Sequence, residues 1–190
     1  MATHFRARRP PRRGLEGPYR ATITGHTVTG TEYLYSTVEI SGTTVIAGDG
    51  SYGTATVDGL SYVRCFYVSG SLTLKNLVVQ NCDAGDAKGG GAYVDQGTIT
   101  LVGTTFHNCR SLRGGGAIFN YDGTVHAFST IFTDNTATNN GGAVFTTGVV
   151  VLNDVFFGGN AAGSYGDAVF LETNGAVTAT DVTSADVFHV

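Results

Sequence analysis

Residues 115–135 read GGAIFNYDGTVHAFSTIFTDN, a unit that recurs with small changes along the chain. Close copies begin at Gly90, Gly141 and Gly166, and a weaker copy begins at Cys65, which takes the place of Ala92. The starts therefore follow one another at a nearly constant step of about 25 residues, within the range of roughly 20 to 50 residues that indicates a solenoid or another repeat architecture.

Within each unit, a Gly-Gly-Ala start leads to a short strand, a glycine turn and a second strand of alternating apolar residues. Such alternation predicts a half-buried strand. The predicted inward positions recur from copy to copy: Leu72, Leu74, Leu77, Val79; Ile99, Leu101, Thr104, Phe106; Val125, Ala127, Thr130, Phe132; Val150, Leu152, Val155 and Phe157. Copies of this kind stack most simply about 4.8 Å apart, in parallel ladders without helices. The sequence therefore predicts an all-β fold, a single-stranded right-handed parallel β-helix of about five to six coils.

Composition divides the chain into a basic arm, residues 1–20, and a β-helix domain, residues 21–190. The arm holds six of the 11 Lys and Arg residues and one of the 15 acidic residues, which leaves a net charge of −9 in residues 21–190. This acidic body argues against nucleic-acid binding, which needs basic stripes. The arm is expected to be disordered; a solvated tail, an organelle-targeting remnant and a segment that docks on an acidic partner are the three interpretations. No stretch resembles a secretory signal or a membrane span.

The last position of each unit reads Cys82, Cys109, Asn135 and Asn160. If this position faces inward at a corner, stacked amides can satisfy one another and the neighbouring backbone. Cys82 and Cys109 would then lie in neighbouring coils, either as two small buried thiols or as a disulfide. Glycines are expected to turn the corners because glycine accepts positive φ: Gly90, Gly91, Gly115, Gly116, Gly141 and Gly142.

The segments GDGSYGTATVDG (48–59) and RCFYVSGSLTLKNLVVQNC (64–82), with the repeated GGA, FTDN (132–135) and FGGN (157–160), carry a family resemblance. On these residues, about 40–185 of the chain is similar to the β-helix proteins of the polymorphic outer-membrane and pectin-lyase-like families. The resemblance implies an extracellular or cell-surface protein, often an adhesin or stalk. It also implies an enzymatic alternative, because a minority of such proteins are polysaccharide lyases or hydrolases.

Carbohydrate chemistry on this fold would need paired carboxylates, or a cation with a base. Asp154 and Asp181 fall at equivalent positions of neighbouring coils and form a candidate cation or acid pair, with Asp134 and Asp186 on a nearby ladder. The alternative is that aspartate simply suits a solvated corner. No Lys or Arg follows Arg113, which disfavours a lyase. His107 and His126 are expected at the surface without an acid partner, and the sequence indicates no catalytic residue, metal or cofactor.

The strand after each GGA carries two consecutive apolar residues, so alternation sends one of each pair outward. The predicted outward, partner-binding positions are Ile118, Ile131, Val144, Phe156 and Val169. Such apolar stripes indicate either contact with a partner or burial under a loop. Residues 176–190 add a part-coil with no covering cap. Two interpretations follow: the sequence is part of a longer β-helix, or this end docks on another chain or associates end to end.

The sequence thus favours a non-catalytic structural or interaction module that contacts a protein or glycan. A carbohydrate-active enzyme is the main alternative. An ice-binding protein is a third interpretation, suggested by Thr98-Ile99-Thr100, although the threonine array breaks at Thr124-Val125-His126 and Val149-Val150-Val151.

Overall fold

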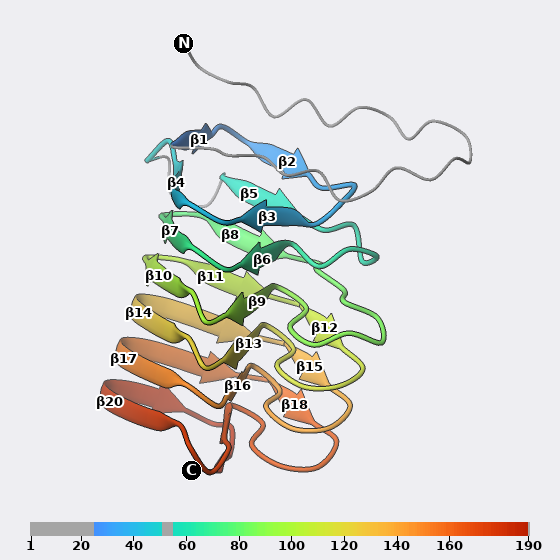
Figure 1. The fold of residues 1–190 in the computed structure, drawn as a ribbon, viewed down its shortest axis with the longest axis vertical. Helices are drawn as coiled ribbons and strands as arrows, with labels where there is room; N and C mark the ends of the chain where they lie inside the picture. The colour runs from blue at the N-terminus through green and yellow to red at the C-terminus, as the bar shows by residue number, and fades with distance from the viewer. Residues whose placement is uncertain (1–24, 51–54, 190) are drawn as a thin grey trace.

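The chain forms stacked coils of parallel strands, about six turns in all (Figure 1). The structure is a computed structural model that describes residues 25–50 and 55–189. The prediction of a right-handed parallel β-helix is confirmed. The basic arm, residues 1–20, lies outside the described residues. None of the described segments forms a helix that could span a membrane.

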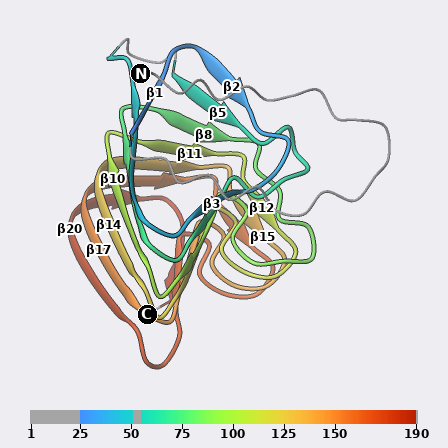
Figure 2. The same ribbon diagram turned by 45° about the horizontal axis from the view of Figure 1, so that its top comes forward.

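The strands lie on three faces, and Figure 2 shows how the coils turn between them. The first face contains β1 (His26–Val28), β4 (Thr43–Gly48), β7 (Ser71–Lys75), β10 (Thr98–Val102) and the first parts of β14 (Thr124–Thr133), β17 (Val149–Gly158) and β20 (Ala176–Ser184). The second face contains β2 (Thr31–Tyr33), β5 (Thr56–Asp58), β8 (Val78–Gln80), β11 (Thr105–His107) and the last parts of β14, β17 and β20. The third face contains β3 (Val38–Ile40), β6 (Phe66–Val68), β9 (Ala92–Asp95), β13 (Ile118–Tyr121), β16 (Val144–Thr146), β19 (Val169–Leu171) and β21 (Phe188–His189). Side loops between the second and third faces carry a smaller sheet of β12 (Arg110–Ser111), β15 (Thr136–Ala137) and β18 (Ala161–Ala162).

In the coils from β7 onward, the bend between the first and second faces is a single residue in the left-handed region. It is occupied by Asn76, Gly103, Ser129, Asp154 and Asp181, with φ between 47° and 57°. Asn, Asp and Gly adopt this conformation at the lowest cost, because a short polar side chain or none avoids the Cβ clash. The sharp bend lets β14, β17 and β20 run on as strands from one face to the next.

The corner that precedes the third face differs in part from the expectation. Gly115 and Gly141 have positive φ as predicted, but in the coil before them the left-handed residue is Gly89 and not Gly90 or Gly91. The prediction of a positive φ is also wrong for Gly116 and Gly142. These two glycines are required for a different reason, since a Cβ there would collide with the carbonyl oxygens of Gly142 and Asp167, respectively, in the next coil.

The register explains this shift. Ile118 pairs with Ala92, so the coil that was expected to begin at Gly90 begins one residue earlier, at Gly89. For the same reason Phe66, rather than Cys65, is the partner of Ala92.

The inward positions of the first and second faces are confirmed. All sixteen are buried, and the rings of Phe106, Phe132 and Phe157 stack inside the coil with centroids 5.7 Å and 5.0 Å apart. Parallel ladders place equivalent residues above one another, so a residue type that repeats along the sequence becomes a continuous stack in the core.

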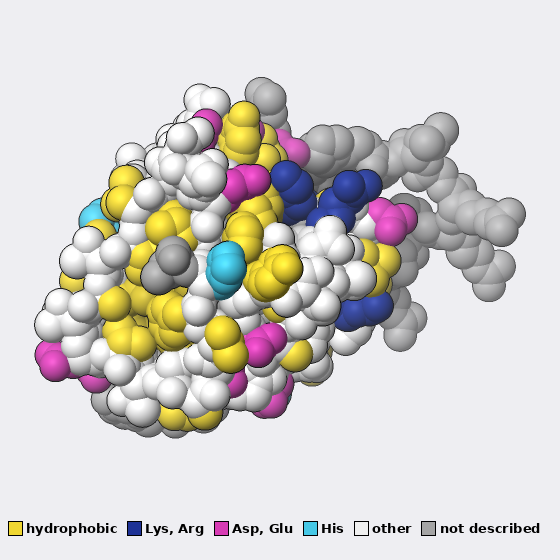
Figure 3. Space-filling view, turned by 90° about the horizontal axis from the view of Figure 1, so that it is seen from below, with side chains coloured by type: hydrophobic (Ala, Val, Ile, Leu, Met, Phe, Trp, Pro, Cys, Tyr) yellow, Lys and Arg dark blue, Asp and Glu magenta, His cyan; other side chains and the backbone are white. Residues whose placement is uncertain are grey.

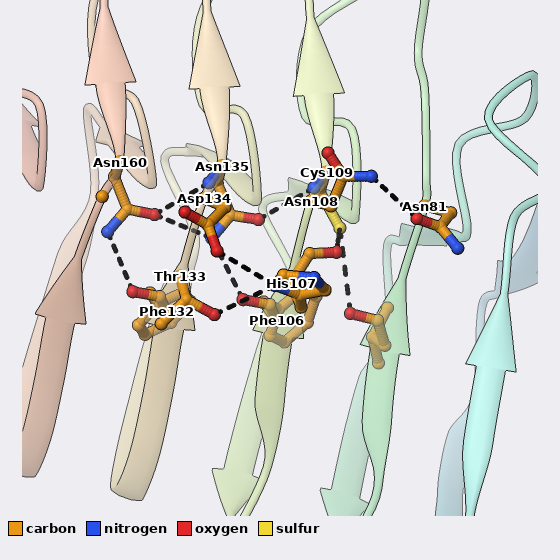
Figure 4. A network of polar contacts seen from close by, with 12 residues as sticks. Asn81, Phe106, His107, Asn108, Cys109, Phe132, Thr133, Asp134, Asn135 and Asn160 are labelled. Carbon is orange, nitrogen blue, oxygen red and sulfur yellow. Dashed lines mark hydrogen bonds and ion pairs between the residues drawn. The ribbon is translucent and has the colours of Figure 1, made fainter.

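The predicted amide stack is also confirmed (Figure 4). The Asn135 side chain is fully buried; its Oδ1 accepts a hydrogen bond from Cys109 N at 3.0 Å, and its Nδ2 donates to Phe106 O at 3.1 Å and to Asn160 Oδ1 at 2.8 Å. Asn160 repeats the pattern one coil on, donating to Phe132 O at 2.9 Å. Asp186 ends the stack, because its carboxylate accepts from Asn160 Nδ2 at 2.7 Å and from Asn160 N at 3.0 Å. Its role is therefore structural.

A disulfide between Cys82 and Cys109 is wrong, and the interpretation as buried free thiols holds for Cys109 but not for Cys82. Cys82 forms a disulfide with Cys65, across a Cα separation of 5.6 Å, while Cys109 is a free, buried thiol. Cysteines stacked in neighbouring coils point in parallel directions, whereas Cys65 and Cys82 approach each other within the range that a disulfide needs. Burial raises the pKa of the Cys109 thiol to about 12.

The amide stack predicts a specific loss of stability. Asn135→Ala removes the acceptor of the Cys109 amide and the donor to Phe106 O, so the free energy of unfolding should fall by about 2 to 4 kcal/mol. Asn153→Ala is the matched control, because Asn153 is an exposed strand asparagine. Its loss should change stability by less than about 0.5 kcal/mol. Urea denaturation measures both, and equal effects would contradict the role given to the stack.

The disulfide assignment predicts the thiol count. Unreduced, denatured protein should show one reactive thiol per chain, located at Cys109 by peptide mapping, and reduced protein should show three. Native protein at pH 8 should react slowly, because the Cys109 thiol is buried and stays protonated. Labelling at Cys65 in unreduced protein would instead indicate the pair Cys82–Cys109.

Candidate functional site

The predicted outward residues divide into two groups. Ile131 and Phe156 are exposed to 42% and 41%, as predicted. Ile118, Val144 and Val169 are wholly buried, so their predicted outward orientation is wrong. These residues lie in one inward column with the buried Phe66 and Ala92, and the aromatic residue that follows each of them takes the outer side.

Those outer rings form an aromatic ladder on the third face. Its six members are Tyr67, Tyr93, Phe119, Phe145, Phe170 and His189. Successive ring centroids lie 4.5 to 5.5 Å apart, and the planes of four of the five pairs are within 12° of parallel. The sequence did carry a signal for this ladder, because Tyr67 and Tyr93 share the register of Phe119. A tyrosine hydroxyl favours the outer side.

A groove lies beside the first rungs of this ladder and is here called the cationic groove. It is shallow and open to solvent, with a volume of about 380 Å³, and is lined by Arg64, Tyr67, Asp86, Ala87, Lys88, Tyr93 and Arg113. Residues 21–190 contain five basic residues, and three of them line this groove. Seen from the C-terminal end in Figure 3, Lys and Arg side chains gather on one side of the molecule.

Backbone carbonyls hold the two arginines of the cationic groove in place. Arg64 donates from Nε to Gly89 O at 3.1 Å and from Nη2 to Lys88 O at 2.7 Å. Arg113 donates from Nε to Asp86 O at 2.7 Å. Burial lowers the pKa of the Arg64 guanidinium, although its ordinary value is so high that the group stays charged.

The aromatic floor of the cationic groove is tied to these cations. Lys88 Nζ lies 4.2 Å from the ring centroid of Phe119, and Arg64 Cζ lies 5.4 Å from that of Tyr93. The Tyr67 hydroxyl donates to Asp95, and this hydrogen bond, with burial and the nearby carboxylate charge, raises the pKa of Tyr67 to about 12. Tyr67 is therefore a neutral hydrogen-bonding group at neutral pH.

A second groove lies at the bend between the first and second faces and is here called the acidic groove. It encloses about 310 Å³ and is lined by Ser129, Thr130, Ile131, Asp154, Val155, Phe156, Asp181 and Thr183. The structure thus brings Asp154 and Asp181 together in one groove, at equivalent positions of neighbouring coils. Ser129 Oγ donates to Asp154 Oδ2 at 2.8 Å. No residue that lines this groove is basic.

The remaining titratable candidates lie apart from the acidic groove. His107 Nδ1 is 3.2 Å from Thr133 Oγ1 and 3.4 Å from Asp134 Oδ2, so the expectation that it has no acidic neighbour is wrong. The His107 side chain is 43% exposed, in agreement with a surface position. His126 stacks on Phe128. Within residues 25–50 and 55–189, no three His, Cys, Asp or Glu side chains gather as a metal site.

The aromatic ladder predicts an asymmetric response to ring removal. Phe119 is 1% exposed and lies between Tyr93 and Phe145. Phe119→Ala should therefore lower the free energy of unfolding by about 3 to 5 kcal/mol. Phe128 is 39% exposed and outside the ladder, so Phe128→Ala should cost less than about 1 kcal/mol. Thermal or urea unfolding compares the two, and similar losses would show that the ladder adds nothing to stability.

Comparison with known proteins gives one family match. Residues 129–147 match the Chlamydia polymorphic membrane protein (Chlamydia_PMP) repeat. The matched segment contains FTDN and GGA, which supply the buried Asn135 and the corner at Gly141. No curated protein and no solved structure shows significant similarity to the chain. The chain is therefore a β-helix repeat protein that resembles the polymorphic outer-membrane proteins.

Proposed function

We propose that this protein is a non-catalytic, adhesin-like interaction module whose outer surfaces contact a protein or glycan partner. The observation that carries the proposal is the exposed apolar pair Ile131 and Phe156, adjacent in one column and lining one groove. Large apolar side chains that share an exposed groove are typical of contact surfaces.

A location at the cell surface agrees with this function. The repeat match points to polymorphic membrane proteins, which supports association with a cell surface. The Cys65–Cys82 disulfide adds an independent argument, since disulfides persist mainly in oxidising compartments such as the cell exterior. We therefore place the proposed contact outside the cytosol.

A carbohydrate-active enzyme is the second candidate, because Asp154 and Asp181 line one groove. Elimination on a uronate polymer would need a cation to stabilise the developing negative charge, and hydrolysis would need one carboxyl group to act as an acid. The acidic groove supplies no basic side chain, so a bound calcium ion would have to provide the charge. Calcium titration followed by thermal unfolding, with assays on uronate polymers, tests this candidate directly.

The ice-binding interpretation has less support. The outward column of the first face that contains Thr73 and Thr100 continues with His126 and Val151. A regular threonine array is therefore interrupted after two rungs.

The unpaired edge of β20 is a second surface at which we propose that the protein contacts a partner. β20 pairs with β17 on one side and with no described strand on the other, and Val177, Val182 and Phe188 are only partly buried. Apolar side chains are visible at this end of the molecule in Figure 3. A free edge pairs readily with a further strand of the same chain or of another, so the proposal includes docking at β20.

The contact role of the acidic groove is tested by surface variants. The double variant Ile131→Ser, Phe156→Ser should fold with little loss of stability but recover at least tenfold less of the native partner from the source extract. The control is Phe128→Ser, which removes an aromatic side chain of similar exposure outside the groove and should keep the partner. Recovery is measured by quantitative mass spectrometry, and an unchanged partner set in the double variant would contradict the proposal.

A further inference from the structure

The acidic groove is built from two adjacent columns of the β-helix. The column at the bend supplies Ser129, Asp154 and Asp181, and the outward column beside it supplies Ile131 and Phe156. Phe156 follows Asp154 by two residues in β17, so the negative charge and the exposed apolar pair lie side by side. A segment that fills this groove must therefore carry both positive charge and apolar side chains.

The carboxylates of the acidic groove have no counterion in the described part of the chain. Asp154 and Asp181 occupy equivalent positions of neighbouring coils, about 4.8 Å apart. Two carboxylates at this spacing repel unless a cation joins them. Between residues 25–50 and 55–189, no Lys, Arg or His nitrogen lies within 4 Å of either carboxylate, whereas Asp134 has His107 as a neighbour.

The basic residues of the body lie elsewhere. Of the five in residues 21–190, three line the cationic groove and Arg110 pairs with Asp83. The fifth, Lys75, is three coils away from Asn153, the neighbour of Asp154, which is about 14 Å along the stack. The other basic residues of the chain are the six arginines of the arm, residues 1–20.

The arm is long enough to reach the acidic groove of its own chain. Val28, at the end of β1, pairs with Gly48, and this column continues through the bend to Asp154, five coils further along. At about 4.8 Å for each coil, the distance along the stack is about 24 Å. Arg13 precedes Val28 by 15 residues, and an extended segment of this length spans up to about 50 Å.

The arm also has the composition that the acidic groove requires. Residues 8–13 read RRPPRR, so an arginine pair stands on each side of Pro10-Pro11. Arginine pairs with a carboxylate through two parallel hydrogen bonds. Proline is apolar and has no N–H, so it can cover an apolar side chain without leaving a donor unsatisfied. The cationic groove carries the same charge as the arm and repels it, which leaves the acidic groove as the complementary surface.

We infer that residues 8–13 dock in the acidic groove of the same chain, with arginines paired to Asp154 and Asp181 and the prolines on Ile131 and Phe156. Attachment to the same chain gives the segment a high effective concentration at the groove. The docked segment covers the apolar pair and competes with the external partner. This regulatory consequence rests on the proposed function, while the docking itself depends only on the groove and the arm.

The test uses a nitroxide spin label on the full chain carrying Ala7→Cys, with amide signals recorded by NMR. Docking places the label beside the acidic groove, so the amides of Ser129, Ile131 and Phe156 should lose most of their intensity. The same labelling of protein without Ala7→Cys corrects for any reaction at Cys109. Raising the salt concentration from about 50 to about 500 mM should restore the signals, because salt screens exposed charge pairs.

Charge variants test whether the acidic groove is the docking site. In Asp154→Asn, Asp181→Asn the broadening at the groove should disappear, and asparagine keeps the left-handed bend at low cost. The matched control is Asp122→Asn, Glu172→Gln, which removes the same charge from two exposed acids outside the groove and should leave the broadening unchanged. Equal loss in both double variants would show attraction to the net charge alone and would overturn the inference.

Two further outcomes would also overturn it. Broadening confined to the coils near β1 would show that the arm does not dock in the groove. Groove broadening in isotope-labelled protein that carries no spin label, mixed with spin-labelled protein at natural isotope abundance, would place the arm of a second copy there instead.

The regulatory consequence has its own measurement. Replacing Arg8, Arg9, Arg12 and Arg13 by glutamine should increase recovery of the native partner from the source extract, and unchanged recovery would contradict competition. Absence of groove broadening, with partner loss in the Ile131→Ser, Phe156→Ser variant, would overturn this inference and leave the proposed function standing. Groove broadening with an unchanged partner set in that variant would overturn the proposed function and leave the docking standing.

Discussion

Parallel pairing between successive coils is the constraint on which the other features of this protein depend. Each strand pairs with the strand one turn away, so every residue lies directly over its equivalent, about 4.8 Å apart. A side chain at a repeated position must therefore be compatible with a copy of itself. Asparagines do so by hydrogen bonding to one another, and phenylalanines do so by stacking their rings. The residues at the bend do so because they adopt the left-handed conformation at low cost.

The same constraint produces the surface. Columns that face inward become the core and the amide stack, which use Asn135, Asn160 and Asp186 for structure. Columns that face outward become continuous stripes, such as the aromatic ladder and the pair Ile131 and Phe156. A functional surface on this fold is thus built from columns and from the side loops that border them, and the cationic groove lies where those two meet.

The parts of the fold that sequence reasoning identified are those repeated within a column. The inward positions of the first and second faces, the buried Asn135 and Asn160, and the outward Ile131 and Phe156 could all be found from alternation and period. The orientation of Ile118, Val144 and Val169 could not be found in this way. Each is followed by a second apolar residue, and alternation alone does not say which of the two faces inward. Tyr67 and Tyr93 would have indicated which residue of each pair faces outward, but only if the repeat that was expected to begin at Gly90 had been aligned one residue earlier, at Gly89.

By itself, the sequence determined that the chain is a β-helix and which residues stack, because like residues recur at a nearly constant period and stacking is local to a column. Tertiary structure decided the contacts between different columns: the partner of Cys82, the approach of His107 to Asp134, and the convergence of Arg64, Lys88 and Arg113. Those contacts depend on how sharply each corner turns and on how the side loops fold back. Neither property is encoded in the repeat, since the corner angle and loop path follow from packing around the whole coil.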